Sequence, residues 1–285
     1  SNDLVATISK VTSDIVQTVC PEVREEYLPH AVNTDIFSRK DEESIDEFKK
    51  SALKQNADKL IFFWNNRNAR RKMTGSLVFW FKEYLDIVGH DKALLLMHTD
   101  PNDPHGQDVL KIMEELNLTD GQVLISREKV APAHLAMIYN IADCTINISD
   151  AEGFGLATFE SLACETPIIV NMTGGLQEQV TDGKDWFGVG IEPASKAIIG
   201  SQDVPFIYED RVSKEDFVNA LIKVTNMSNE ERRDLGKKGR GHVLESYSMD
   251  KFAEKWDEIL TKVHSDFGSW ENRKDYKSWE FVELK

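Results

Sequence analysis

NISDAEGFGLATFESLACETPIIVN (Asn147–Asn171) contains the most informative pattern in this sequence. A β-branched run at 145–148 predicts a buried strand, and a tight loop with two glycines follows it at 149–155. The spacing of apolar residues predicts a helix over 154–164, and the run 167–171 predicts another strand. The stretch is therefore expected to form a strand, a glycine loop, a helix and a second strand.

The predicted loop suits an anionic ligand. Gly153 and Gly155 can adopt a positive φ, and the free N–H groups at the start of the helix carry partial positive charge. Glu152 precedes the glycines and Glu160 lies about one helical turn further on, so two carboxylates flank the predicted phosphate site. Because carboxylates repel phosphates, we expect them to bind neutral hydroxyls, as in a sugar and a ribose. The pattern predicts a nucleotide-sugar site, and a solvated loop without a ligand is the alternative.

This stretch resembles the donor signature of the family four retaining glycosyltransferases, which have the GT-B fold. The resemblance rests on Glu152-Gly153-Phe154-Gly155-Leu156, on Glu160 eight positions after Glu152, and on Ala163 with Pro167-Ile168-Ile169-Val170. It implies that Glu152 holds sugar hydroxyls and that Glu160 holds the ribose, both by positioning the donor rather than by exchanging protons. Ser149 is expected either to bond a phosphate or to cap the loop.

Composition fits a globular protein with a sizeable core. The chain has 285 residues, of which 41% are hydrophobic, and its apolar runs are far shorter than the ~18 residues of a membrane-spanning helix. The N-terminus lacks the layout of a signal peptide. Three widely spaced cysteines favour free thiols in a reducing cytosol, so we expect a cytoplasmic protein. The net charge of −15 argues against a nucleic-acid or anionic membrane partner.

The first 37 residues are expected to form a separate piece. Residues 4–19 predict a strand and an amphipathic helix with Ile15, Val16 and Val19 on its apolar face. A proline-restricted connection follows, up to residue 37. The family has such a connection between its two domains, so the resemblance implies that residues 1–37 are the end of an otherwise absent N-terminal acceptor domain and its linker.

From residue 38 to 265, short apolar strands alternate with amphipathic helices. Strands are expected at 60–64, 93–98, 122–126, 144–148 and 167–171, and helices at 42–56, 74–88, 106–117, 132–143 and 154–164. This alternation predicts an α/β fold, a Rossmann-like parallel sheet with helices on both faces. Ligands of such sheets bind at the carboxyl ends of the strands. On the resemblance, this part is the donor-binding C-terminal half of a GT-B fold.

The last third of the chain is predicted to be irregular at first and then helical. Residues 182–210 predict an irregular excursion rich in glycine and proline. Three helices follow at 214–226, 229–246 and 249–264, the second of them opened by a capping box of Ser228 and Glu231. The tail, 266–285, is expected either to dock on the missing N-terminal domain through Trp270, Trp279 and Phe281 or to pack on its own domain.

A basic loop follows the predicted strand at 60–64. The run Asn65-Asn66-Arg67-Asn68-Ala69-Arg70-Arg71-Lys72 holds four cations in six residues. At the carboxyl end of a strand, Arg67 and Lys72 can reach a diphosphate, and the family has an arginine and a lysine at this separation. This chain has Asn66 where the family has glycine, and Arg71 is the rival candidate. The alternative is a solvated basic turn.

Other loops carry weaker signals. Arg127 and Val130 follow the strand at 122–126, where the family reads the nucleobase through backbone groups; uridine, guanosine and adenosine all stay open. The loop 173–178, with its glycine pair, resembles a family loop that supports the site. His98 is expected to be a satisfied histidine at a strand end. Neither a Cys/His cluster nor HExxH spacing occurs, so no metal site is expected.

The resemblance implies transfer of a sugar from a UDP- or GDP-type nucleotide sugar to an acceptor with retention at the anomeric carbon, without a cofactor or a metal. Arg67, Lys72 and Glu152 are the candidate catalytic residues, because the cations and the helix N-terminus near Gly155 would stabilise the charge on the leaving diphosphate. The alternatives are a nucleotide-sugar 2-epimerase of similar fold and a binding module without activity. An NAD-dependent dehydrogenase is weaker still, since no suitable acid lies about twenty residues after the glycines.

Overall fold

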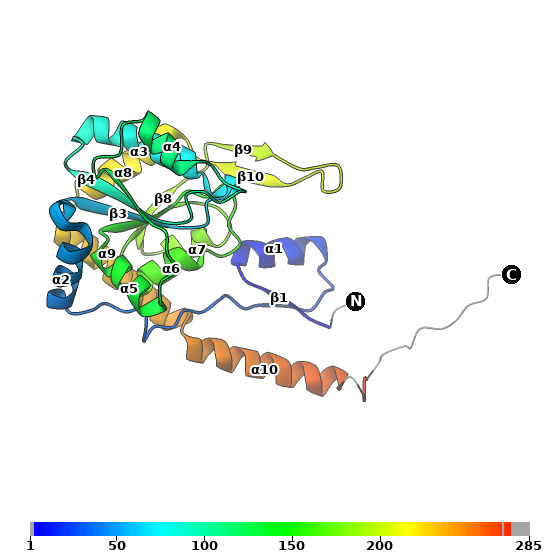
Figure 1. The fold of residues 1–285 in the computed structure, drawn as a ribbon. Helices are drawn as coiled ribbons and strands as arrows, with labels where there is room; N and C mark the ends of the chain where they lie inside the picture. The colour runs from blue at the N-terminus through cyan, green and yellow to red at the C-terminus, as the bar shows by residue number, and fades with distance from the viewer. Residues whose placement is uncertain (1–2, 270, 275–285) are drawn as a thin grey trace.

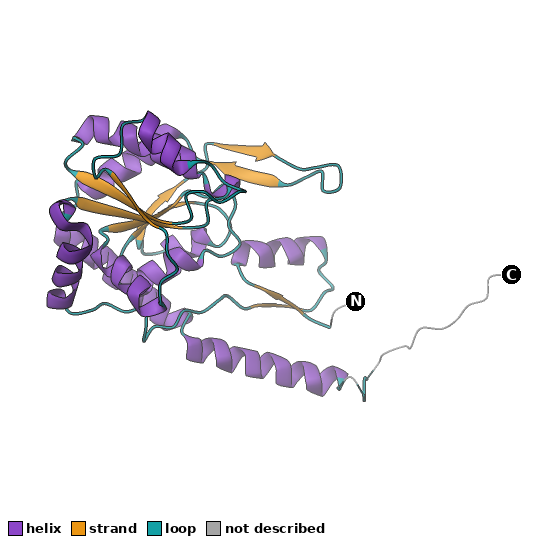
Figure 2. Cartoon of the chain, viewed as in Figure 1, coloured by secondary structure: helices purple, strands orange, loops and turns teal. Residues whose placement is uncertain are grey.

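The computed structural model describes residues 3–269 and 271–274, and a six-stranded parallel sheet forms its centre (Figures 1 and 2). The strands are β3 (Leu60–Asn65), β4 (Ala93–His98), β5 (Val123–Ser126), β6 (Cys144–Asn147), β7 (Ile168–Asn171) and β8 (Gly188–Ile191). Their order in the sheet is β5-β4-β3-β6-β7-β8. The chain therefore builds the sheet outward from β3 to one edge and then outward from β6 to the other, so the direction of winding reverses between β3 and β6.

Helices cover both faces of this sheet, as the sequence predicts. One face carries α3 (Thr74–Val88), α4 (Val109–Glu115) and α8 (Lys214–Thr225). The other carries α2 (Glu42–Leu53), α5 (Pro132–Ile141), α6 (Leu156–Ala163), α7 (Leu176–Val180) and α9 (Asn229–Ser246). Side chains of β3 alternate between the two cores: Phe62 and Trp64 pack in one and Ile61 and Phe63 in the other. Because both faces are covered, all four are fully buried.

The predicted starts of two helices are confirmed. Helix α5 begins at Pro132, whose missing N–H costs nothing in the first turn. Helix α9 has the predicted capping box, in which Ser228 and Glu231 each accept from the other's backbone N–H.

The prediction of an irregular segment at 182–210 is wrong. The segment contains β8, which pairs with β7, and a hairpin of β9 (Ser195–Ile198) and β10 (Tyr208–Arg211). The sequence does not predict β8, because its glycines weaken the apolar pattern that is typical of a strand. At Gly188, however, a Cβ atom would lie 1.9 Å from the carbonyl oxygen of Ile168, so the close approach of the two strands requires glycine.

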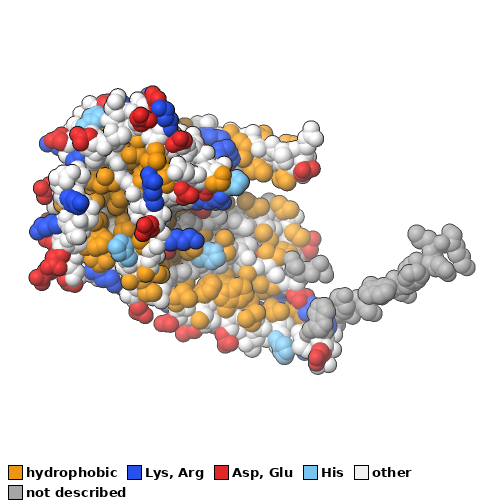
Figure 3. Space-filling model, viewed as in Figure 1, with side chains coloured by type: hydrophobic (Ala, Val, Ile, Leu, Met, Phe, Trp, Pro, Cys, Tyr) orange, Lys and Arg blue, Asp and Glu red, His pale blue; other side chains and the backbone are white. Residues whose placement is uncertain are grey.

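The hairpin, α1 (Lys10–Val19) and α10 (Met249–Phe267) project from the same side of the body (Figure 1). Exposed apolar side chains lie on the hairpin and on α10 (Figure 3). Strand β1 (Val5–Thr7) pairs in parallel with β2 (Glu25–Tyr27), outside the main sheet. Of the predicted apolar face of α1, Ile15 and Val19 are 57% and 78% exposed, whereas Val16 is partly buried.

The docking role expected for the tail concerns three aromatic residues. Trp270, Trp279 and Phe281 lie outside the described residues. Within residues 3–269 and 271–274, no helix has the length and apolar character needed to cross a membrane.

Two glycines of α9 test the packing of this helix. A Cβ on Gly236 would lie 1.8 Å from the carbonyl oxygen of Glu165, whereas a Cβ on Gly241 would meet no atom within 4 Å. We expect Gly236→Ala to lower the free energy of unfolding by about 1–3 kcal/mol, because the helix must move away from its neighbour. Gly241→Ala should raise it by up to about 1 kcal/mol through helix propensity alone. Urea unfolding measures both, and equal shifts in the two variants would contradict this packing.

Candidate functional site

The loops after β3 and β6 meet at the carboxyl edge of the sheet. The backbone N–H of Asp150 donates to the carbonyl oxygen of Arg71 at 2.8 Å, which joins the two loops directly. Asn171, at the end of β7, donates from its side chain to the carbonyl oxygen of Ser149 at 2.9 Å. Three neighbouring strands therefore position this site, which lies where the winding of the sheet reverses.

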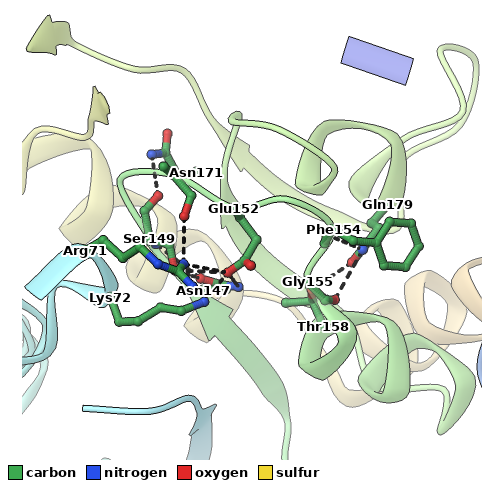
Figure 4. A network of polar contacts seen from close by, with 11 residues as sticks. Arg71, Lys72, Asn147, Ser149, Glu152, Phe154, Gly155, Thr158, Asn171 and Gln179 are labelled. Atoms are coloured by element: carbon green, nitrogen blue, oxygen red, sulfur yellow. Dashed lines mark hydrogen bonds and ion pairs between the residues drawn. The ribbon is translucent and has the colours of Figure 1, made fainter. Parts of the chain in front are cut away.

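An ion pair between the buried Lys72 and the partly buried Glu152 lies at the centre of these loops (Figure 4). Lys72 ends a 3₁₀ turn, η2 (Arg70–Lys72), and Met73 turns the chain into α3 with a positive φ of 59°. Burial lowers the pKa of Lys72, and the Glu152 carboxylate opposes that shift. Arg71 approaches the same Glu152 oxygen at 3.7 Å and donates to the carbonyl oxygen of Ala151 at 2.9 Å.

Arg67 is held away from this pair. Its guanidinium binds Asp103 through two hydrogen bonds of 2.6 and 3.1 Å, and its side chain is 61% exposed. The hydrogen bond from Arg67 lowers the pKa of Asp103 to about 2. Of the two candidate arginines, the structure therefore brings Arg71, the rival, next to Lys72, while Arg67 reaches the loop after β4. Its part in donor binding stays a prediction.

Ser149 is fully buried in the loop that follows β6. Its hydroxyl donates to Asn147 Oδ1 at 2.5 Å and lies 3.4 Å from Glu152 Oε2. Asn147 Nδ2 lies 3.5 Å from the same carboxylate oxygen. The sequence interpretation missed Asn147, although a polar residue at the end of a buried strand was the available signal.

At the start of α6, Gly155 has the positive φ expected from the sequence, whereas Gly153 does not. Gly155 is the N-cap residue, with φ 98°, and Gly153 is exposed beside it. The Phe154 side chain is buried and packs edge-on against Phe159, so only its backbone can face a ligand. Leu156, in the first helical turn, is about half exposed.

A glycine loop after β7 packs against the backbone of the loop that carries Glu152. Gly174 has φ 50°, and a Cβ there would lie 1.7 Å from the carbonyl oxygen of Glu152. The N–H of Gly175 donates to that same carbonyl oxygen at 3.3 Å. The two loops therefore pack backbone to backbone, which agrees with the supporting role predicted for this segment.

Glu160 lies one helical turn into α6 and faces Tyr139 of α5. The Tyr139 hydroxyl donates to Glu160 Oε2 at 2.8 Å and accepts from Asn65 Nδ2 at 2.9 Å. Burial raises the pKa of Glu160 to about 7, and the hydrogen bond from Tyr139 opposes the shift. The sequence interpretation missed Tyr139, because a buried tyrosine in a helix has the pattern of a core residue.

The base of the hairpin adds a network of ion pairs that the sequence interpretation missed. Glu209, 2% exposed, accepts from Arg70 at 2.9 Å and from Arg211 at 2.8 Å. Arg211 lies 2.9 Å from a carboxylate oxygen of the fully buried Asp150. Burial raises the pKa of Asp150 to about 6, and Arg211 opposes that shift. The hairpin is thereby anchored to both loops of the site.

The remaining candidates lie toward the β5 edge of the sheet. Arg127 is exposed and Val130 partly buried in the loop after β5. His98 Nδ1 lies 2.9 Å from Ser126 Oγ, as expected for a satisfied histidine at a strand end, and burial lowers its pKa. In the described part of the chain, no group of three or more His, Cys, Asp or Glu side chains could hold a metal ion.

Glu160 gives a prediction for stability against pH. Its folded-state pKa of about 7 lies above the usual 4.5, so the native state keeps a proton that the unfolded state releases in this window. Stability contributed by this group therefore falls as pH rises from 4.5 to 7. We expect Glu160→Gln to raise the free energy of unfolding at pH 8 by up to about 3 kcal/mol and to change it little at pH 4. Urea unfolding at both pH values tests this, with the exposed Glu47→Gln on α2 as control; a variant equal to wild type at pH 8 would contradict a buried, destabilising carboxylate.

Comparison with known proteins agrees with this geometry. The model of the family "Glycosyl transferases group 1" matches residues 82–242. D-inositol 3-phosphate glycosyltransferase of Paenarthrobacter aurescens is 31% identical over 104 residues, which are 36% of this chain and 24% of that protein. A probable sucrose-phosphate synthase of Thermosipho melanesiensis is 25% identical over 251 residues, 86% of this chain and 49% of that protein. The chain thus spans half or less of the length of these curated relatives.

Solved structures match over nearly the whole chain. Sucrose-phosphate synthase of Thermosynechococcus elongatus has a TM-score of 0.74 at 22% identity, covering 93% of this chain and 59% of that one. The Anabaena protein HepE in complex with UDP-glucose has a TM-score of 0.70 at 13% identity, covering 91% and 64%. These similarities show the α/β fold of GT-B glycosyltransferases. Since the family model covers more than half of the sequence, this chain belongs to the glycosyl transferases group 1 family.

Proposed function

We propose that this chain is the donor-binding part of a retaining glycosyltransferase that uses a nucleoside diphosphate sugar of the UDP or GDP type. One observation carries the proposal: the ion pair of the buried Lys72 with Glu152 lies beside the glycine turn that opens α6, at the carboxyl edge of the sheet. A cation and free helix N–H groups suit the diphosphate, and a carboxylate suits the sugar hydroxyls.

The ion pair suggests how the donor enters. Lys72 is buried, so its charge needs a partner at every stage of binding. In the proposed complex, a phosphate oxygen of the donor replaces Glu152 as that partner. The released Glu152 carboxylate then accepts hydrogen bonds from the sugar. The exchange keeps Lys72 paired and makes Glu152 available only when a donor is present.

The same groups would then assist the reaction. The bond between the anomeric carbon and the diphosphate oxygen breaks while a bond from that carbon to an acceptor oxygen forms. Negative charge develops on the leaving diphosphate, which takes up the proton that the acceptor loses. Lys72, the nearby Arg71 or the predicted Arg67, and the N–H groups at the start of α6 would stabilise that charge. These cations supply positive charge from the protein itself, so we propose neither a metal nor a cofactor. Retention follows from the resemblance of the donor signature.

The other end of the donor would lie along the same edge. Glu160, which Tyr139 connects to the end of β3, is proposed to bind the ribose. The backbone near Arg127 and Val130 is proposed to contact the base. HepE, which shares the fold, is named with UDP-glucose bound, which supports a nucleotide sugar as the donor.

We further propose that residues 1–37 are the end of an N-terminal acceptor domain and its linker, and that the acceptor binds between the two domains. In support, β1 and β2 pair with each other rather than with the main sheet, and α1 exposes Ile15 and Val19. The three cysteines form no disulfide, which supports the proposed cytoplasmic location.

Calorimetric titration with UDP, GDP and their sugars tests the donor site. We expect Lys72→Ala, Glu160→Ala and Arg67→Ala each to weaken binding by at least about 1 kcal/mol, the scale of a lost hydrogen bond to a charged group. Arg233→Ala, which removes an exposed ion pair with Glu42, is the control and should have no effect. Affinity unchanged in all variants would refute the site, and loss with Arg71→Ala but not Arg67→Ala would assign the arginine to the rival position.

The proposed exchange at Lys72 makes a separate prediction for Glu152→Gln. At pH 7 the variant should bind UDP more tightly than wild type does, because the competing carboxylate is gone. It should also lose the extra affinity that a sugar gives to UDP-sugar over UDP. Titrations of both ligands against wild type measure the two effects. Weaker binding of UDP by the variant would contradict the exchange.

A further inference from the structure

Tyr139 has a hydroxyl that packing does not require. The residue lies on α5 with no exposed surface, and the rings of Phe63 and Phe37 pack edge-on against it at 5.0 and 6.1 Å. A phenylalanine would fill this position as well. A buried hydroxyl is retained at no cost only when it is hydrogen-bonded, so its partners indicate its use.

The hydrogen bonds of this hydroxyl have a defined direction. Asn65 Nδ2 donates to it at 2.9 Å, so the hydroxyl oxygen accepts there. Its single proton is then directed to Glu160 Oε2, 2.8 Å away. Asn65 is the last residue of β3 and pairs with His98 of β4, so the relay from Asn65 through Tyr139 to Glu160 starts on a central strand.

The relay leaves one oxygen of Glu160 available. Glu160 Oε2 accepts from Tyr139, whereas Oε1 has no hydrogen bond within residues 3–269 and 271–274 and is not among the buried unpaired atoms. A carboxylate oxygen can accept two hydrogen bonds, which suits the neighbouring 2′- and 3′-hydroxyls of a ribose. Burial raises the pKa of Glu160 to about 7 and the proton donated by Tyr139 opposes that shift, so the ionised, accepting form of the carboxylate predominates above pH 7.

We propose that Tyr139 is a positioning residue that gives the site its preference for ribonucleotides over deoxyribonucleotides, because it holds Glu160 with Oε1 facing the ribose diol. The inference rests on the proposed function, in which Glu160 binds the ribose, and adds the residue that sets this specificity. The ligand class it defines is a ribonucleoside diphosphate with both ribose hydroxyls intact.

Tyr84 provides a matched control. It is also a fully buried tyrosine, its hydroxyl lies 2.7 Å from Thr225 Oγ1, and it belongs to the core on the opposite face of the sheet. Tyr84→Phe and Tyr139→Phe remove the same atom from equally buried sites, but only Tyr139 contacts Glu160.

The test is the ratio of affinities for UDP and 2′-deoxy-UDP, measured by calorimetry on the full chain. We expect wild type and Tyr84→Phe to prefer UDP by about tenfold, the scale of one hydrogen bond to a charged group. In Tyr139→Phe the ratio should fall severalfold toward one, while the affinity for inorganic pyrophosphate, which has no ribose, stays at the wild-type value. Asn65→Ala, which frees the hydroxyl to rotate, should lower the ratio by a smaller factor.

Two results would overturn the inference. The first leaves the proposed function intact, and the second also contradicts the role proposed for Glu160. If Glu160→Gln abolishes the preference but Tyr139→Phe and Asn65→Ala keep it, the hydroxyl is structural only and the proposed function stands. If wild type shows no preference, or Glu160→Gln keeps it, Glu160 does not read the ribose and that part of the proposed function fails too. Should Tyr139→Phe lose pyrophosphate binding through misfolding, Asn65→Ala decides alone.

Discussion

A buried lysine must have a partner, and this constraint organises the site. Lys72 and Glu152 are 80 positions apart in the sequence, and the parallel pairing of β3 with β6 brings the loops that carry them together. The backbone of Asp150 bonds that of Arg71, which links the two loops directly. The sheet thereby places a pair of opposite charges next to a helix N-terminus. The lysine and the helix N–H groups suit a phosphate, and the carboxylate suits a neutral sugar beside it.

The surroundings of this pair support the geometry of the two loops. Gly174 allows the loop after β7 to pack on the Glu152 backbone. On the other side, Arg70 and Arg211 share the buried Glu209 at the base of the hairpin. A donor that entered here would meet charges that are already paired and oriented, so little reorganisation would be needed beyond the exchange at Lys72.

Much of the fold could be predicted, since the apolar runs of β3, β4, β6 and β7 alternate with amphipathic helices and their boundaries fall close to the observed ones. Strand β8 could not be predicted, because glycine at position 188 is typical of a loop. The need for glycine there comes from the close approach of Ile168, which the sequence alone does not show. For the site, strand-end positions predicted that Lys72 and Glu152 lie at one edge. Arg67 pairs with Asp103, and Tyr139 bonds Glu160. Both contacts depend on which loops and helices become neighbours in the fold, and no local sequence pattern predicts that.

Amide hydrogen exchange with and without saturating UDP is the sharpest test of a donor site at Lys72 and Glu152, because it reports on every loop at once. We expect UDP to slow exchange in two segments far apart in the sequence, 66–74 and 149–158, and Lys72→Ala to remove the protection of both. Protection confined to another part of the chain, such as the cavity between the linker at 27–31 and the start of α10, would contradict it.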